Sequence, residues 1–289
     1  MENTKQNTPY INLRTKMFEI LSRNNSNVSD DDILEFSDYF NHEYQEFKDG
    51  FKLYRYMPVN YDNIRNLETE SIYLSYNGSM NDIYEGIPDF RKDIQTYNKI
   101  KSLEDLVLMK CFSESFDIPL MWGHYADSST GFCIEYNIGN IDSTSEILQH
   151  IFPVIYTDKR IANFDLDELM ENNKTLNCDI FQNAEPDGYF PDIYKLFLLK
   201  GNDWSYEQEW RILYSKYELY KNNYDWEEKR KICLPCTSAI YLGAKMHPKY
   251  KEHIQEIVER LNSNLDGHRE KIKIYEMKLN NKFFKFDFE

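Results

Sequence analysis

The sequence predicts an α+β protein with a curved or split, largely antiparallel sheet and flanking helices. Runs with the residue types of strands and runs with helical periodicity follow one another without the strict alternation that a doubly wound parallel sheet requires. No GxGxxG and no GxxxxGK[ST] pattern occurs in the 289 residues, so the common phosphate-loop folds have no support.

Composition limits the class of protein. A chain of 289 residues, 41% hydrophobic and 29% charged, is typical of a globular protein with a sizeable core. Its formal net charge of −15 repels phosphate backbones, so broad nucleic-acid binding is not expected. The sequence has no apolar run of the roughly 20 residues that cross a bilayer, and its first residues show no signal-peptide core. Five scattered cysteines do not form a secreted disulfide framework, which predicts a cytoplasmic protein.

The N-terminal part, residues 1–50, is expected to be a helical element that precedes an α+β domain over 51–289. The clearest helix lies at 29–48, where Ser29 and Asp32 form a capping box. Apolar residues three and four positions apart give this helix one apolar face. They are Ile33, Phe36, Phe40, Tyr44 and Phe47.

The rest of the chain mixes strand and helix patterns. Strands are expected where β-branched and aromatic residues gather between turn residues. These runs are 51–59, 71–77, 107–114, 132–138, 152–158, 204–214, 236–244 and 271–279. Helical patterns are found at 61–70, 88–109, 118–127, 164–173, 179–200 and 248–264.

Several short strings occur in a fixed order along the chain. They are LYRYMP at 53–58, YLSYNGSMND at 73–82, KCFSES at 110–115, MWGHYADSSTGFCIEY at 121–136, EQEWRI at 207–212 and YLG at 241–243. This order resembles a widespread bacterial family of unknown function, whose members run LY(K/R)Y, FNDPF, CFS, MWxHYA…GFCIEF and EWR. The resemblance covers roughly 51–245. One string departs from the family pattern: Met80-Asn81-Asp82-Ile83-Tyr84 stands where the family has FNDPF, without its proline.

A second resemblance concerns function. An arginine on an early strand, a serine on a later strand and an E-x-E string, in this order, are similar to the layout of ADP-ribosyltransferases. Here these residues are Arg55, Ser75, Glu207 and Glu209. The resemblance implies a split-sheet α+β fold, NAD as substrate, and transfer of ADP-ribose to a protein or other acceptor, or hydrolysis of NAD. In bacteria such activities often serve as toxins or in phage defence.

The resemblance also implies roles for these residues. Cleavage of NAD passes through an oxocarbenium-like transition state, which the carboxylate of Glu209 would stabilise. Glu207, expected on the same face of the same strand, would orient or deprotonate the acceptor. Arg55 would bind a phosphate or ribose oxygen through its planar fork, and Ser75 would support the ribose.

Further residues are expected to bind the nucleotide. Tyr56, Tyr76, Trp122 and Tyr125 can stack on nicotinamide. His124 can act as a base or contact a phosphate, because histidine titrates near neutral pH. The expected nucleotide-binding residues are therefore Arg55, Tyr56, Tyr76, Asn81, Trp122, His124 and Tyr125.

Each of these residues also has an ordinary structural interpretation. Glu207 and Glu209 can pair with cations on neighbouring strands, and Arg211 on the same strand face is a candidate partner for Glu209. His124 can simply hold its turn through hydrogen bonds. Asn81 followed by aspartate is common in turns.

Two other functions stay open from the sequence. In the first, the same pocket senses a small anionic ligand through Arg55, Trp122 and His124 without any chemistry. In the second, the protein processes nucleic acid, which the net charge of −15 opposes. Cys233 and Cys236 form a lone CxxC with no second ligand pair, so no metal site is expected.

Overall fold

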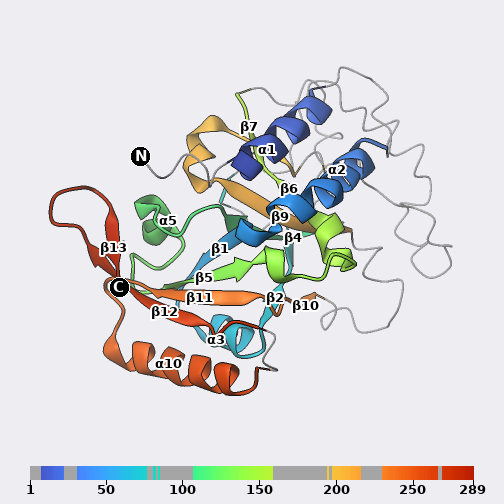
Figure 1. Ribbon diagram of the computed structural model, residues 1–289. Helices are drawn as coiled ribbons and strands as arrows, with labels where there is room; N and C mark the ends of the chain where they lie inside the picture. The colour runs from blue at the N-terminus through green and yellow to red at the C-terminus, as the bar shows by residue number, and fades with distance from the viewer. Residues whose placement is uncertain are drawn as a thin grey trace, which may run out of the picture.

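The computed structural model describes residues 8–22, 31–76, 81, 82, 84, 107–158, 194, 197–215, 230–265 and 269–289. These residues form an α+β fold around a nine-stranded sheet of order β13-β12-β11-β5-β1-β4-β9-β6, in which β3 also pairs with β4 (Figure 1). The α+β class and the largely antiparallel sheet are confirmed. The sheet is mixed, because β11 and β12 run parallel, and it lies open without the predicted curl.

Most strands lie close to the runs that the sequence indicates, whereas β8, β10 and β13 were not predicted. Two small two-stranded sheets, β10 with β2 and β7 with β8, accompany the large one. The bounds are β1 Lys52–Met57, β2 Ser71–Tyr73, β3 Ser75–Tyr76, β4 Val107–Ser113, β5 Phe132–Asn137, β6 Ile151–Pro153, β7 Ile155–Tyr156, β8 Leu199–Lys200, β9 Glu209–Ser215, β10 Lys231–Cys233, β11 Thr237–Leu242, β12 Lys273–Leu279 and β13 Phe286–Phe288.

The described helices also follow their sequence signals. Asn60 caps α3 by accepting a hydrogen bond from the Asn63 amide, and Pro248 occupies the first turn of α10. The α-helices are α1 Thr8–Leu21, α2 Asp31–Phe47, α3 Tyr61–Glu68, α5 Pro119–His124 and α10 Pro248–Ser263. The 3-10 helices are η1 Lys48–Gly50, η3 Ile138–Asn140, η4 Glu146–His150 and η7 Asn202–Glu207.

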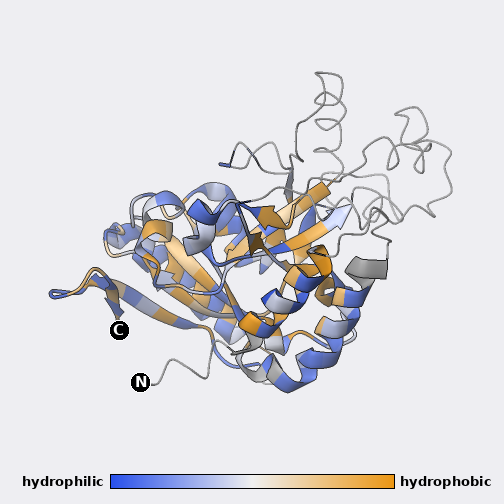
Figure 2. Ribbon diagram, turned by 90° about the horizontal axis from the view of Figure 1, so that it is seen from above, coloured by the Kyte–Doolittle hydropathy of each residue, from blue (hydrophilic) through white to orange (hydrophobic). Residues whose placement is uncertain are grey.

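The two N-terminal helices pack on the sheet. Phe36 and Phe40 of α2 and Met17 of α1 are fully buried and belong to the same apolar core as the strands. The indole of Trp210 in β9 contacts the ring of Phe40 at a centroid distance of 6.4 Å. Apolar residues gather along the strands, whereas polar ones gather on the outer turns of the helices (Figure 2). Burial of each large side chain contributes about 1.5–3 kcal/mol, so the predicted helical element is anchored to the sheet.

Three predicted segments differ from the structure or fall outside it. Of the helix expected over 179–200, the structure describes residues 194 and 197–200, and Leu199–Lys200 form strand β8, which pairs in parallel with β7. The helix expected over 88–109 gives way to β4 from Val107, and its earlier residues lie outside the described part, as does the whole of 164–173. The capping box of Ser29 and Asp32 also lies outside the residues and side chains described.

The large sheet opens between β1 and β4. The two strands share a single residue pair, Tyr54 with Ser113. Beyond it, β1 continues along β5 as far as Met57, and β4 continues along β9 as far as Val107. Strand β3 pairs with the edge of β4 that β1 leaves free, where Ser75 lies opposite Met109. The two strands therefore part, and side chains of both enter the space between them.

Candidate functional site

A cavity of about 670 Å³ lies where β1 and β4 part. Its walls come from β1, β3, β4 and α5, and from the segment that leads from β8 into β9. Consecutive residues of β1 and of β4 line it, which is the pattern expected of a space between two diverging strands. Ligand pockets in proteins commonly have volumes of about 300–1,000 Å³, so the cavity can hold a nucleotide-sized molecule.

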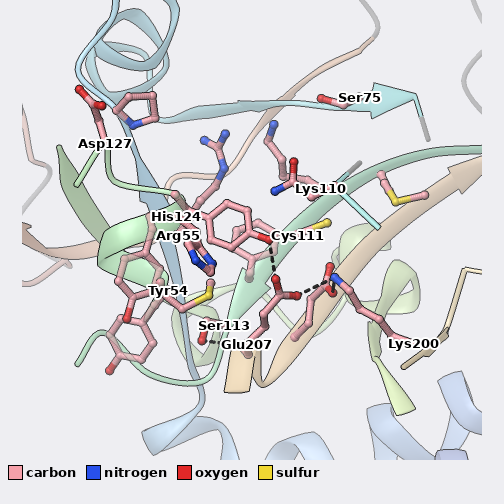
Figure 3. Close-up of a pocket in the computed structure, with 18 residues that line it drawn as sticks. Tyr54, Arg55, Ser75, Lys110, Cys111, Ser113, His124, Asp127, Lys200 and Glu207 are labelled. Carbon is pink, nitrogen blue, oxygen red and sulfur yellow. Dashed lines mark hydrogen bonds and ion pairs between the residues drawn. The ribbon is translucent and has the colours of Figure 1, made fainter. Parts of the chain in front are cut away.

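The cavity brings together most of the residues that the sequence singled out (Figure 3). Those that line it are Arg55, Tyr56, Ser75, Asn81, His124, Tyr125, Glu207 and Glu209.

Two of the residues expected to stack on nicotinamide are not among the residues that line the cavity. Trp122 is fully buried, and its indole N–H donates a hydrogen bond to the Phe116 carbonyl at 2.7 Å, so its ring is not open to a ligand. Tyr76 lies under the guanidinium of Arg230, 4.7 Å from the ring centroid.

A buried lysine joins the two glutamates. The ammonium of Lys200 donates hydrogen bonds to Glu207 Oε2 at 2.6 Å and to Glu209 Oε2 at 2.9 Å. The three residues are 9%, 2% and 4% exposed, so their charges are largely withdrawn from water. Buried charges persist only when they are paired, and here two carboxylates share one cation. Dashed lines mark these contacts in Figure 3.

Glu209 is held by a second cation. Arg211 donates from Nε to Glu209 Oε1 at 2.9 Å and from its terminal nitrogen to Oε2 at 3.0 Å, and it also donates to the Phe197 carbonyl. Burial alone would raise the pKa of Glu209. The charges of Arg211 and Lys200 outweigh this effect and hold that pKa well below its usual range. The carboxylate therefore stays ionised, and the predicted pairing of Arg211 with Glu209 is confirmed.

The pKa of Glu207 is shifted in the opposite direction. Burial, followed by the negative charge of Glu209, raises its pKa, although Lys200 and a 2.5 Å hydrogen bond from the Tyr125 hydroxyl oppose the shift. Two neighbouring carboxylates with pKa values pushed apart can act one as a fixed anion and the other as a proton acceptor.

The expectation that Glu207 and Glu209 share one strand is wrong. Glu207 ends the 3-10 helix η7, and Gln208 has left-handed dihedral angles with φ of 48°. Strand β9 begins only at Glu209. The carbonyl of Glu207 accepts a 2.7 Å hydrogen bond from the Ser113 hydroxyl, which fixes this turn. The two side chains meet because the chain turns between them, not because of strand periodicity.

A strained loop supports the α5 side of the cavity. Asp127, Ser128 and Ser129 have positive φ angles of 47°, 56° and 70°, which non-glycine residues rarely adopt. The Gly243 and Lys245 amides donate to carbonyls of Gly131 and Ser129. A Cβ atom on Gly243 would lie 2.3 Å from the Ser129 oxygen, so only glycine allows this approach.

Two cations lie at the other end of the cavity, in Arg55 of β1 and Lys110 of β4. Burial and the charge of Arg55 hold the pKa of Lys110 well below its usual range.

Sequence reasoning missed Lys110 and also Lys200. The sequence does contain a signal for Lys110, because VLMKCFS places one charged residue inside an otherwise apolar strand. Lys200 had no such signal, because LLKGN has the residues of a helix end.

The thiols near the site are not activated. Burial and the charge of Glu209 raise the pKa of Cys111, which lines the cavity. Cys233 is exposed and Cys236 buried, and both are free thiols.

Within the described ranges, no group of three or more His, Cys, Asp and Glu side chains is placed to hold a metal ion. Those ranges also contain no helix long and apolar enough to cross a membrane.

Arg14 of α1 holds the start of β9 in place. Its guanidinium contacts Glu114 Oε1 at 2.8 Å, the carbonyl of Glu209 at 3.0 Å and the carbonyl of Val154. Hydrogen bonds to charged groups contribute about 1.5–3 kcal/mol each when partly buried, and they leave unpaired acceptors when they are removed.

We expect Arg14→Met to lower the free energy of unfolding by about 2 kcal/mol. Urea denaturation measures this change. The matched control is Arg260→Met, whose ion pair with Glu68 is exposed and should contribute less than about 1 kcal/mol. Equal stability of the Arg14 variant and the wild type would contradict this account of α1.

Comparison with known proteins gives one match. Residues 121–212 match a family described as "Protein of unknown function (DUF2971)". No curated protein and no solved structure shows a significant match to the chain. The matched residues contain β5, most of α5 and the start of β9, and thus carry His124, Lys200, Glu207 and Glu209, whereas Arg55 precedes them. The match over residues 121–212 supports the resemblance to a family of unknown function that the ordered strings of the sequence indicate.

Proposed function

We propose that the cavity binds NAD and that the protein cleaves the bond between nicotinamide and ribose, as an enzyme similar to ADP-ribosyltransferases. ADP-ribose would pass to a protein or other acceptor, or to water. One observation carries this proposal: an ionised carboxylate, Glu209, and a carboxylate of raised pKa, Glu207, share one cavity with Arg55 and Ser75. The cytoplasm, where the sequence predicts the protein to act, supplies NAD. A role in toxicity or phage defence belongs to the same proposal.

The chemistry assigns each carboxylate a step. The glycosidic bond breaks, its electron pair leaves with neutral nicotinamide, and positive charge develops on the ribose. The fixed negative charge of Glu209 stabilises this charge in a site of low polarity. The nucleophilic oxygen or nitrogen of the acceptor then bonds to the ribose carbon, and its proton passes to Glu207.

The remaining walls suit the rest of the substrate. Tyr56 and Tyr125 offer aromatic surface for nicotinamide, although Tyr56 is 6% exposed and donates its hydroxyl to the Ser115 carbonyl. His124 is exposed at the cavity wall and lies 3.1 Å from the Tyr206 hydroxyl, where it can meet an incoming acceptor.

A second function has its own observation. Both oxygens of Glu209 already accept hydrogen bonds from Arg211 and Lys200. A purely structural ion network would show the same pairing. Under this alternative the cavity senses a small anionic ligand without chemistry, and Glu209→Gln changes ligand binding modestly.

The first test is nicotinamide release from NAD by the purified protein. Protein-bound ADP-ribose after incubation with cell lysate is measured in parallel, because an enzyme that requires its acceptor releases nothing alone. Release in either assay supports the transferase proposal. Absence of both products, with NAD or another nucleotide still bound, supports the sensing alternative.

The raised pKa of Glu207 predicts a pH dependence. As the pH falls through that pKa, Glu207 gains a proton and can no longer accept one, so kcat/KM should fall. Glu209 stays ionised over this range, because its own pKa lies well below. Glu207→Gln should lower kcat/KM by about 10²-fold and remove this acid limb. A pH profile of kcat/KM for both proteins measures the effect, and an unchanged acid limb in the variant would assign it to another group.

A further inference from the structure

Two positive side chains line the cavity, and among the described residues no hydrogen bond or ion pair joins either of them to an acidic group. Arg55 comes from β1 and Lys110 from β4, and the charge of Arg55 acts directly on Lys110. Both side chains are partly buried and line the cavity. Figure 3 shows them, with Ser75, on the side of the cavity opposite Glu207 and Lys200.

The groups that contact the Arg55 guanidinium are neutral. The Arg55 guanidinium contacts the sulfur of Met57 at 3.7 Å and the hydroxyl of Tyr136. Over the part of the chain that the structure describes, no hydrogen bond or ion pair engages the Lys110 ammonium. The charge of Arg230 also acts on Lys110 and adds to the positive potential.

The acidic groups of the cavity are engaged elsewhere. Glu207 and Glu209 are bound by Lys200 and Arg211. Asp127 is exposed, and it accepts a hydrogen bond from the Thr130 hydroxyl in its own loop. Lys200 shows how this protein pairs a buried ammonium, with two carboxylates within 3 Å. Among the residues that the structure describes, Lys110 has no such partner, so its burial is unfavourable unless an anion enters the cavity.

Adjacent guanidinium and ammonium groups fit two adjacent anionic groups. The planar fork of Arg55 matches the oxygens of one phosphate, and the mobile ammonium of Lys110 meets a second as a point charge. A single carboxylate would leave one of the two cations uncompensated.

We propose that Arg55 and Lys110 form the subsite for the diphosphate of a nucleotide ligand, with Lys110 as its specificity-determining cation. This assignment rests on the proposed function for the identity of the ligand, and it orients NAD with the diphosphate between β1 and β4 and the scissile bond toward Glu207 and Glu209.

The test is calorimetric binding of inorganic pyrophosphate and of ADP-ribose to the wild type, Lys110→Met, Lys110→Arg and Lys251→Met. Lys110→Met should weaken the binding of both ligands by about 10- to 100-fold, the usual effect of a lost charge-assisted hydrogen bond. Lys110→Arg should keep most of the affinity because it keeps the charge. The control Lys251→Met removes a surface ion pair with Glu276 and should leave affinity unchanged.

Thermal unfolding without ligand checks the fold of the variants. Lys110→Met should melt at or above the temperature of the wild type, because it replaces a buried uncompensated charge by an apolar side chain. A lower melting temperature would contradict the assignment.

Two results would overturn the subsite: no binding of either ligand by the wild type, or equal binding by the wild type and Lys110→Met. The outcome is separate from that of the catalytic proposal. Pyrophosphate binding that persists without any nicotinamide release supports the subsite alone, and release that is insensitive to Lys110→Met supports catalysis alone.

Discussion

Glu209→Gln is expected to slow nicotinamide release from NAD by about 10²–10³-fold, the usual effect of removing one preorganised electrostatic group from an active site. The substitution keeps the size of the side chain but removes the negative charge that we propose to stabilise the developing positive charge of the ribose. Steady-state assays of nicotinamide release, at saturating and at limiting NAD, measure kcat and kcat/KM for the two proteins.

The matched control is Glu276→Gln, which removes a carboxylate from a surface ion pair with Lys251. It should release nicotinamide at the rate of the wild type. Circular dichroism shows whether the Glu209 variant is folded, and its affinity for ADP-ribose shows whether the cavity is intact. A folded, ligand-binding Glu209→Gln protein with the turnover of the wild type would refute the catalytic role of this residue.

Arg211→Met is expected to lower the free energy of unfolding by about 3–5 kcal/mol, because it removes one partner of a buried ion pair and leaves Glu209 undercompensated. Arg211 is fully buried and engages both carboxylate oxygens as well as the Phe197 carbonyl. Glu207 and Glu209 would then both depend on Lys200 for charge compensation. Urea denaturation, followed by fluorescence, measures the loss.

A double variant tests whether the undercompensated charge of Glu209 causes this loss of stability. Glu209→Gln in the Arg211→Met background removes the uncompensated charge and should restore part of the lost stability. Lys251→Met serves as the surface comparison and should cost less than about 1 kcal/mol. A loss below 1 kcal/mol in Arg211→Met would show that the network is not essential to the fold.

The elements with a periodic pattern were predicted well. Helix α2 follows from the spacing of Phe36, Phe40 and Tyr44, all buried in the structure. Strand β5 follows from the β-branched and aromatic residues of FCIEY, and it is buried between β1 and β11. In both cases, local residue preference and tertiary burial favour the same structure.

The errors come from segments where tertiary contacts override local preference. Residues 199–200 end a run with helical signals, followed by Gly201 in the stop position, but they form β8, because β7 offers a backbone edge. The turn at Gln208 has no glycine or other turn signal, and hydrogen bonds from outside hold it, including that of Ser113 to Glu207. A single sequence does not show these partners.

Several of the residues that line the cavity were predictable from the sequence, but Lys110, Lys200 and the arrangement of the cavity were not. The order of Arg55, Ser75 and the two glutamates along the sequence resembles that of a known enzyme class, and the structure places all four around one cavity. That placement depends on where β1 and β4 part, which is a property of the pairing of distant strands. Trp122 lies one residue from the cavity-lining Met121 and turns into the core, a direction that the motif does not specify.

The most direct test of the central claim is a crystal structure of the Glu209→Gln protein with NAD bound. The account predicts the diphosphate within hydrogen-bonding distance of Arg55 and Lys110, and the nicotinamide ribose beside Glu207 and residue 209. NAD bound outside the space between β1 and β4, or bound there with its ribose away from both acidic positions, would contradict it.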